Sequence, residues 1–152
     1  MTNTIQTEKE LRDNLQAELA EIGSQKDYMT LPQVNAFRTF LVGLAKVLDA
    51  RAADIKQQIR ENKPDGADEA DAAQAQSDLE SNYQREFAIA QQQKNVRAAF
   101  ESMRNDEYGY CVDCGAEIGM ERMIAMPWSI RDADCATLFE LKMQQNTGRR
   151  AA

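Results

Sequence analysis

Two long stretches without proline, joined by a short proline-glycine turn, constrain the fold of this chain more than any other feature. The first stretch covers residues 33–63, and the second covers residues 67–108 and also lacks glycine. Between them lies Pro64-Asp65-Gly66, a combination typical of a turn. Two long helices joined by a short turn must run antiparallel, so the pattern predicts a coiled-coil hairpin and a mainly α fold.

Start and stop signals indicate where each helix begins and ends. Thr7 and Glu10 form a capping-box pattern, and Gly23 is a natural C-terminal stop. Thr30 can cap the next helix, with Gln33 three residues later. We therefore expect helices at residues 8–22, 31–61, 69–105 and 136–145, the last followed by a frayed tail. The helix at 31–61 would be about 45 Å long at 1.5 Å per residue.

Apolar residues at helical spacing predict which faces of the hairpin helices meet. In the first hairpin helix the spacings alternate near four and three, as in a heptad repeat, with Arg51 as an interruption. The positions expected in this seam are Phe37, Leu41, Leu44, Leu48, Ile55 and Ile59. In the second hairpin helix they are Leu79, Tyr83, Phe87, Ala90, Val96, Phe100 and Met103.

The expected hairpin tip, residues 64–73, is rich in carboxylates. Asp68 and Asp71 are three residues apart, so on a helix they share a face. One interpretation is helix capping, because acidic side chains are favourable near free N–H groups at a helix N-terminus. The other is functional: a pair of carboxylates at the end of a long probe, placed to meet a cation or a basic site.

Three cysteines suggest a metal site in the region that follows the hairpin. Cys111-x-x-Cys114-Gly115 is a zinc-knuckle pattern, in which two thiolates bind one metal and the glycine permits the tight turn. The second pair of a four-cysteine site reads Asp132-Ala-Asp-Cys135, with Asp132 in place of a cysteine. The open alternatives are a Cys3Asp zinc site, a lost metal site held by apolar packing, and a redox pair at Cys111 and Cys114.

Composition excludes several classes of function. The chain has no histidine, which excludes Ser-His-Asp and Cys-His catalysis and HExxH metal sites, and no other nucleophile–base pair is evident. Its formal net charge of −7 argues against a duplex-binding module. The N-terminus does not have the pattern of a signal peptide, and no apolar run is long enough to span a bilayer. An odd number of cysteines favours a reducing cytoplasm.

The order of these features resembles the DksA/TraR family of bacterial transcription factors. The resemblance extends from Asp27 to the last helix and is strongest at residues 108–119 and 134–138. It implies a protein that binds RNA polymerase rather than DNA and inserts its coiled coil into the secondary channel, toward the catalytic magnesium. There the tip alters the stability of promoter complexes and represses ribosomal RNA promoters. By this resemblance the tip determinants are Asp68, Asp71 and Ala73.

Two departures from the family pattern change what the resemblance implies. Asp132 replaces a zinc cysteine, so a four-thiolate site is in doubt. The family's basic contacts to the alarmone guanosine tetraphosphate fall on Asn95, Met126 and Ala136, none of which is cationic. A polyphosphate site without lysine or arginine lacks charge-assisted hydrogen bonds. We therefore expect a weak response to the alarmone, or none.

The sequence thus predicts a monomeric, cytoplasmic regulator that is not an enzyme. We expect an N-terminal helix and connector (1–30), the hairpin (31–106), a zinc-finger-like subdomain (107–135) and a C-terminal helix and tail (136–152). RNA polymerase is the expected partner, without membrane or sequence-specific DNA contact. The alternatives are a transcript-cleavage factor acting through the same channel, and an interaction hairpin that does not act on polymerase. A DNA-binding zinc finger is the least favoured, because only Arg122 and Arg131 are basic between Cys111 and Cys135.

Overall fold

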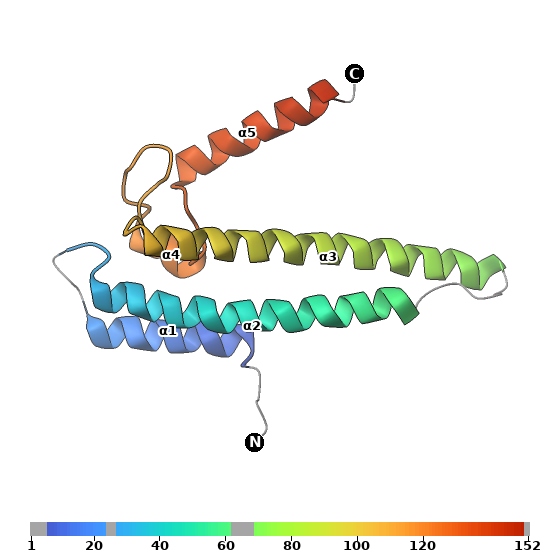
Figure 1. The fold of residues 1–152 in the computed structure, drawn as a ribbon, viewed down its shortest axis with the longest axis horizontal. Coiled ribbons are helices and arrows are strands. Elements are labelled where there is room, and N and C mark those ends of the chain that lie inside the picture. Colours follow the sequence, from blue (N-terminus) through green and yellow to red (C-terminus); the bar gives the residue numbers. More distant parts are fainter. Residues whose placement is uncertain (1–5, 24–26, 62–68, 151–152) are drawn as a thin grey trace.

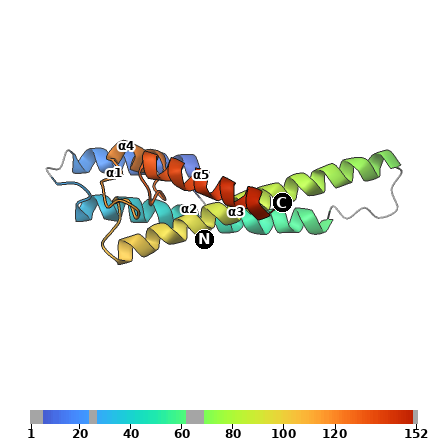
Figure 2. The same ribbon diagram turned by 90° about the horizontal axis from the view of Figure 1, so that it is seen from above.

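The computed structural model describes residues 6–23, 27–61 and 69–150, which form a mainly α structure built on a long hairpin (Figure 1). The helices in these ranges are α1 (Glu8–Ile22), α2 (Leu31–Glu61), α3 (Glu69–Arg104), α4 (Met120–Ala125) and α5 (Ala133–Arg150). α2 and α3 lie side by side and cross at a shallow angle, which confirms the antiparallel hairpin (Figure 2). We call the end that carries α1, α4 and the cysteine region proximal, and the end toward residues 62–68 distal.

The helix ends follow the capping signals closely. At the start of α1 the Glu10 backbone N–H donates to Thr7 Oγ1, and the Thr7 N–H donates to Glu10 Oε2 at 2.7 Å. At α2 the Thr30 N–H donates to Gln33 Oε1 at 2.8 Å. The prediction for the last helix was too short, because α5 begins at Ala133 and continues to Arg150. The short helix α4 was not predicted.

The hydrophobic core lies in the proximal half, where α1 packs on α2 and both hairpin helices meet the cysteine region. Gly43 allows the close approach of α1, because a Cβ atom at this position would collide with the Leu11 side chain. The predicted α2 seam is confirmed at its five buried positions, which are Phe37, Leu41, Leu44, Leu48 and Ile55. The remainder of the buried cluster includes Leu15, Val96, Ala99, Met103, Tyr108, Ile118 and Met123.

Arg12 joins three parts of the proximal end. Its guanidinium lies 5.6 Å from the centroid of the Phe40 ring and 5.7 Å from that of Trp128. It also donates a hydrogen bond to the Ala125 carbonyl oxygen at 3.1 Å. A planar, always charged group can satisfy both aromatic faces and a carbonyl acceptor at once. Arg12 therefore connects α1 to α2 and to the segment that follows α4.

The predicted seam of α3 is wrong in its distal half. Tyr83 and Phe87 were expected against α2, yet they are 53% and 67% exposed, and Ala90 is exposed as well. Asn82, which was not expected in the seam, is buried at 5% exposure instead. Ile89 packs against the core cluster. One residue along an α-helix corresponds to a rotation of 100°. The seam of α3 is therefore offset by one residue from the apolar pattern in the sequence.

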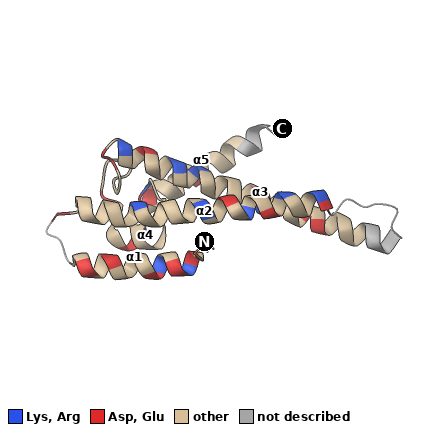
Figure 3. Ribbon diagram, turned by 60° about the horizontal axis from the view of Figure 1, so that its bottom comes forward, with Lys and Arg blue, Asp and Glu red and all other residues tan. Residues whose placement is uncertain are grey.

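Charges of both signs are interspersed along the helices that the structure describes (Figure 3). Arg51, which interrupts the α2 seam, is exposed and pairs with Glu8 of α1 at 3.3 Å. Glu8 also pairs with Arg12 at 3.2 Å. Among the described residues, no helix is long and apolar enough to cross a bilayer.

Candidate metal centre and hairpin tip

A tight turn after α3 positions the first two cysteines. The Cys111 N–H donates to the Ala116 carbonyl at 2.8 Å, and the Gly115 N–H donates to the Cys111 carbonyl at the same distance. Gly115 has a φ of +73°, a left-handed conformation that glycine adopts without strain. Tyr110 and Glu117 form an isolated antiparallel bridge that closes the turn. The local sequence therefore folds into the knuckle that its cysteine spacing predicts.

The knuckle brings four candidate ligands together. One ligand atom from each of Cys111, Cys114, Asp132 and Cys135 lies within 4.8 Å of the others. Cys114 Sγ is 3.0 Å from Asp132 Oδ2. Cys111 is buried, Cys114 is exposed, and the other two are half-buried. The structure thus assembles all four residues that the sequence spacing indicated, including the aspartate.

Asp132 serves two elements with its two oxygens. Oδ2 faces Cys114, while Oδ1 accepts a hydrogen bond from the Cys135 backbone N–H at 2.9 Å. Cys135 is the third residue of α5, so this bond caps the helix N-terminus. A cysteine at position 132 would be a poor cap. The aspartate therefore links the cluster directly to the start of α5.

The close packing of these groups perturbs their pKa values in opposite directions. Hydrogen bonds from the Cys111 thiol and then from the Cys135 N–H lower the pKa of the Asp132 carboxyl. The hydrogen bond to Asp132 raises the pKa of the Cys114 thiol, because it stabilises the protonated form. A hydrogen bond between the Cys135 thiol and Asp132 likewise raises the pKa of that thiol. The carboxylate therefore carries the negative charge beside Cys114 and Cys135, and metal binding must displace the protons of these two thiols.

The donor set fits zinc. Three thiolates and one carboxylate are accepted zinc ligands, and tetrahedral coordination with Zn–S near 2.3 Å places sulfur atoms about 3.8 Å apart. Ligand atoms within 4.8 Å of one another can reach this arrangement with small side-chain adjustments. Four protein ligands would fill the tetrahedral coordination of zinc and leave no position for a water, which is the pattern of a structural site.

Two tyrosines attach the knuckle to the hairpin. The buried Tyr108 hydroxyl donates to the Pro127 carbonyl at 2.7 Å, and its ring packs against Phe37 of α2. The Tyr28 hydroxyl donates to the Gly109 carbonyl at 2.9 Å and accepts from the Gly119 N–H at 3.2 Å. Burial raises the pKa of Tyr28 to about 12, despite the hydrogen bond from Gly119. The four candidate ligands therefore rest on the main hydrophobic core.

No pattern in the sequence indicated that Arg131 and Phe139 help to position the cysteine region. Arg131 Nε donates to Asp113 Oδ2 of the knuckle at 2.7 Å, and its guanidinium lies 4.0 Å from the centroid of the Phe139 ring in α5. Asp113 and Phe139 are 18 and eight residues away from Arg131 in the chain. No helical or metal-ligand spacing relates residues at these distances, so the sequence does not predict the contacts. They hold the first turns of α5 beside the knuckle.

The hairpin tip lies partly outside the described residues. Asp68 is outside them, and for Asp71 the structure describes only its place in the first turn of α3. Ala73 is exposed on the same helix. The shared face of the two aspartates, and its role, therefore remain predictions.

The three expected alarmone positions belong to different elements of the proximal region. Asn95 is exposed on α3, Met126 is half-buried just after α4, and Ala136 is half-buried in α5. None of these positions has a cationic side chain. We therefore still predict that they do not bind phosphate.

Comparisons with known proteins match both the chemistry and the shape. Residues 106–141 match the family model described as the prokaryotic dksA/traR C4-type zinc finger. The RNA polymerase-binding transcription factor DksA of Escherichia coli (strain K12) is 31% identical over 127 residues, which cover 81% of this chain and 82% of that protein. Its namesake in Haemophilus influenzae is 25% identical over 128 residues, or 84% and 88% of the two chains.

A solved structure supports the fold independently. Transcription factor DksA2 from Pseudomonas aeruginosa superposes with a TM-score of 0.68 at 21% identity, covering 82% of this chain and 96% of that one. The long hairpin with a small domain at one end is therefore an architecture that this chain shares with a protein of low sequence identity.

Proposed function

This chain belongs to the DksA/TraR family, and on that basis we propose that it is a transcription regulator that binds RNA polymerase. The distal hairpin enters the secondary channel of the polymerase, and its tip alters the stability of promoter open complexes. Repression of ribosomal RNA promoters, as in the stringent response, is the expected outcome. The protein acts as a monomer in the cytoplasm and has no enzymatic activity of its own.

The observation that carries this proposal is the projection of the hairpin beyond the core. α3 has 36 residues, a length of about 54 Å. α1 packs on α2, while α4 and the knuckle lie beside the C-terminal part of α3, so all three are at the proximal end of the hairpin (Figure 1). A two-helix probe can enter a narrow channel that excludes a globular domain, and acidic side chains favour its encounter with a basic channel.

In this proposal the metal cluster is structural. Cys111, Cys114 and Cys135 would hold zinc as thiolates, with Asp132 as the fourth ligand. Zinc supplies cross-linking between the knuckle and α5, and this chain's residues determine where the two meet. The proximal end remains outside the channel, where it limits how far the hairpin enters.

We also propose that regulation depends only weakly on guanosine tetraphosphate. The positions that correspond to the family's basic contacts, Asn95, Met126 and Ala136, cannot form charge-assisted bonds to phosphate. A titration of the alarmone into a polymerase complex of this protein is expected to change ribosomal promoter activity less than twofold. Full synergy would contradict this part of the proposal.

An Asp71→Asn variant tests the role of the tip. It is expected to bind polymerase with nearly the affinity of the unmodified protein but to lose the shortening of open-complex lifetime on a ribosomal promoter. Asp78→Asn is the matched control, because Asp78 is exposed on the same helix and its amide can still accept the hydrogen bond from Gln74. The control is expected to keep its full effect on transcription.

Three outcomes decide between the candidate functions. Equal transcriptional effects for Asp71→Asn and the unmodified protein would refute the proposed tip function. Transcript shortening in a backtracked complex, lost in Asp71→Asn, would favour the cleavage factor, where carboxylates hold a metal. Absence of any polymerase binding would favour an interaction hairpin.

A further inference from the structure

α3 carries an exposed apolar surface that the tip and the metal cluster do not explain. Leu79, Tyr83 and Phe87 are four residues apart and therefore lie on one side of the helix; we call them the aromatic stripe. Tyr83 is 53% exposed and Phe87 is 67% exposed. Together with Gln76, Glu80 and Gln84 the stripe lines a groove on the helix surface.

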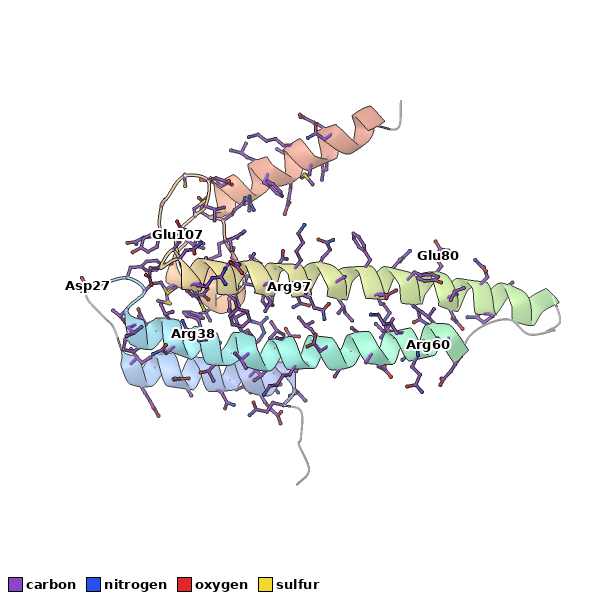
Figure 4. All side chains as sticks on the ribbon, viewed as in Figure 1. Asp27, Arg38, Arg60, Glu80, Arg97 and Glu107 are labelled. Atoms are coloured by element: carbon purple, nitrogen blue, oxygen red, sulfur yellow. The ribbon has the colours of Figure 1, made fainter. Side chains whose placement is uncertain are left out.

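The aromatic stripe is separate from the coiled-coil seam. Asn82 faces α2 at 5% exposure, one residue away from Tyr83, so the stripe is turned about 100° from the seam. Glu80, at the edge of the stripe, points away from α2 (Figure 4). The helix thus buries an amide in the hairpin while it leaves two aromatic rings in water. Single exposed apolar residues are common, but a contiguous set with polar edges is typical of an interaction site.

We propose that the aromatic stripe is a second contact with RNA polymerase, docking on an apolar ridge in the channel wall. This inference rests on the proposed function. Phe87 is 16 residues from Asp71 along the same helix, a distance of about 24 Å. When the tip reaches the interior of the polymerase, the stripe must enter the channel behind it. Its aromatic rings then face the wall rather than solvent.

The size of the stripe argues against a second copy of this chain as the occupant. It extends over about 12 Å of helix and consists of three side chains. A complete phenylalanine or tyrosine buries about 150–250 Å², but Tyr83 and Phe87 are only 53% and 67% exposed and Leu79 is half-buried, so the three together offer well below the roughly 800 Å² that a stable dimer needs on each partner. The stripe is sufficient only as part of a larger interface, which the inserted hairpin provides.

The edges of the stripe define the chemistry of the surface that it meets. Gln76 and Gln84 offer amide groups, Glu80 offers a carboxylate, and the groove has no basic lining residue. The complementary surface is an apolar ridge with a lysine or arginine opposite Glu80. Aromatic residues at the centre of such an interface typically account for much of the binding energy. The stripe therefore supplies affinity, and the tip supplies the effect on the promoter complex.

The test compares a Tyr83→Gln/Phe87→Gln double variant with a Ser81→Gln/Ala88→Gln control. All four positions are exposed in the same segment of α3, and glutamine has good helix propensity. We expect the Kd for RNA polymerase to rise at least about tenfold for the stripe variant and less than twofold for the control. Circular dichroism should show equal helicity for the unmodified protein and both variants. At saturating concentration the stripe variant should still shorten open-complex lifetime, unlike Asp71→Asn.

The possible failures are distinguishable. If the unmodified protein does not bind polymerase, the proposed function and this inference both fail. If it binds, and the stripe variant binds equally well, only this inference fails. Sedimentation that shows a dimer of the unmodified protein, converted to monomer by the stripe substitutions, would overturn it in favour of a second copy.

Discussion

The proximal and distal halves of the same hairpin are built differently. In the proximal half Phe37, Leu41 and Leu44 are fully buried between α1, α3 and the cysteine region. In the distal half Ile55 of α2 lies beside Ile89 of α3, and farther out Asn82 is buried while Tyr83 and Phe87 face solvent. α2 and α3 pair in both halves. In the proximal half α1 and the cysteine region also pack on the hairpin.

This difference separates stability from recognition. Burial of large apolar side chains in the proximal half provides the free energy of folding. The distal half is an extension of two helices whose direction is determined by that core, so its exposed side chains can vary without loss of the fold. A polar residue at a seam position favours one pairing of the helices at some cost in stability.

The largest expected effect comes from the same substitution made in each half. Phe37→Ala removes a fully buried ring and is expected to lower the free energy of unfolding by about 3–5 kcal/mol. Phe87→Ala removes a ring that is 67% exposed and should change it by less than about 0.5 kcal/mol. Urea denaturation followed by circular dichroism measures both. Similar losses for the two variants would show that the halves do not differ in this way.

A second, smaller effect concerns the candidate metal cluster at the proximal end. Asp132→Asn keeps a side chain that can cap α5 but replaces a carboxylate ligand by a neutral amide. Its zinc affinity should fall at least about tenfold, because even partners outside the ligand set change affinity by that factor. Asp132→Cys should bind zinc more tightly but lose the cap from the Cys135 N–H.

Competition with a chelating dye measures the zinc affinity of both variants, and elemental analysis gives the metal content. Amide hydrogen exchange in the first turn of α5 reports the cap, whose loss is expected to cost about 1 kcal/mol. Distal α3 amides should be unaffected in both variants. Equal zinc affinity for Asp132→Asn and the unmodified protein would show that Asp132 is not a ligand.

The smallest expected effect is a decrease in the stability of the fold at alkaline pH, caused by ionisation of Tyr28. The pKa of Tyr28 is raised to about 12 in the folded chain by burial, above the ordinary value of 10.0. The unfolded chain therefore ionises first, so this stabilisation is complete below pH 10 and is lost as the pH rises to 12. Since Tyr28 is only half-buried, we expect about 1 kcal/mol at most.

Denaturation at several pH values between 9 and 12 measures this dependence, with Tyr28→Phe as the comparison. The variant lacks hydrogen bonds to Gly109 and from Gly119 and should be less stable at every pH. Its stability should nevertheless fall less steeply above pH 10. An unchanged slope would assign the alkaline dependence to other groups.

Local signals in the sequence predicted much of the fold and of the candidate metal site. The capping residues Thr7 and Glu10 and the seam from Phe37 to Leu48 act over one to three helical turns, so they were readable without a structure. The cluster of Cys111, Cys114, Asp132 and Cys135 followed from ligand spacing alone. The sequence also indicated the replacement of one thiolate by a carboxylate.

The distal part of the α3 seam could not be predicted from the sequence, because the rotation of α3 is determined by packing in the proximal half. Met103, Val96, Ile89 and Asn82 are spaced by seven residues, and the first two are buried in the proximal core. A continuous helix carries that orientation outward, so Asn82 faces α2 whether or not it is apolar. The apolar pattern of Tyr83 and Phe87 suggested the neighbouring face.

The sequence by itself determined the helices α1, α2 and α3, the hairpin and the candidate ligands of the cysteine region, because each depends on residues close together in the chain. Only the tertiary structure decided which face of distal α3 is buried, that Asp132 caps α5 while it faces the thiols, and that Arg12 joins α1 to Phe40 and Trp128. Each of these features requires a contact between segments that are distant in the chain, such as that of Asp132 with Cys114. Packing between such segments rotates a rigid helix as a whole and leaves the aromatic stripe exposed.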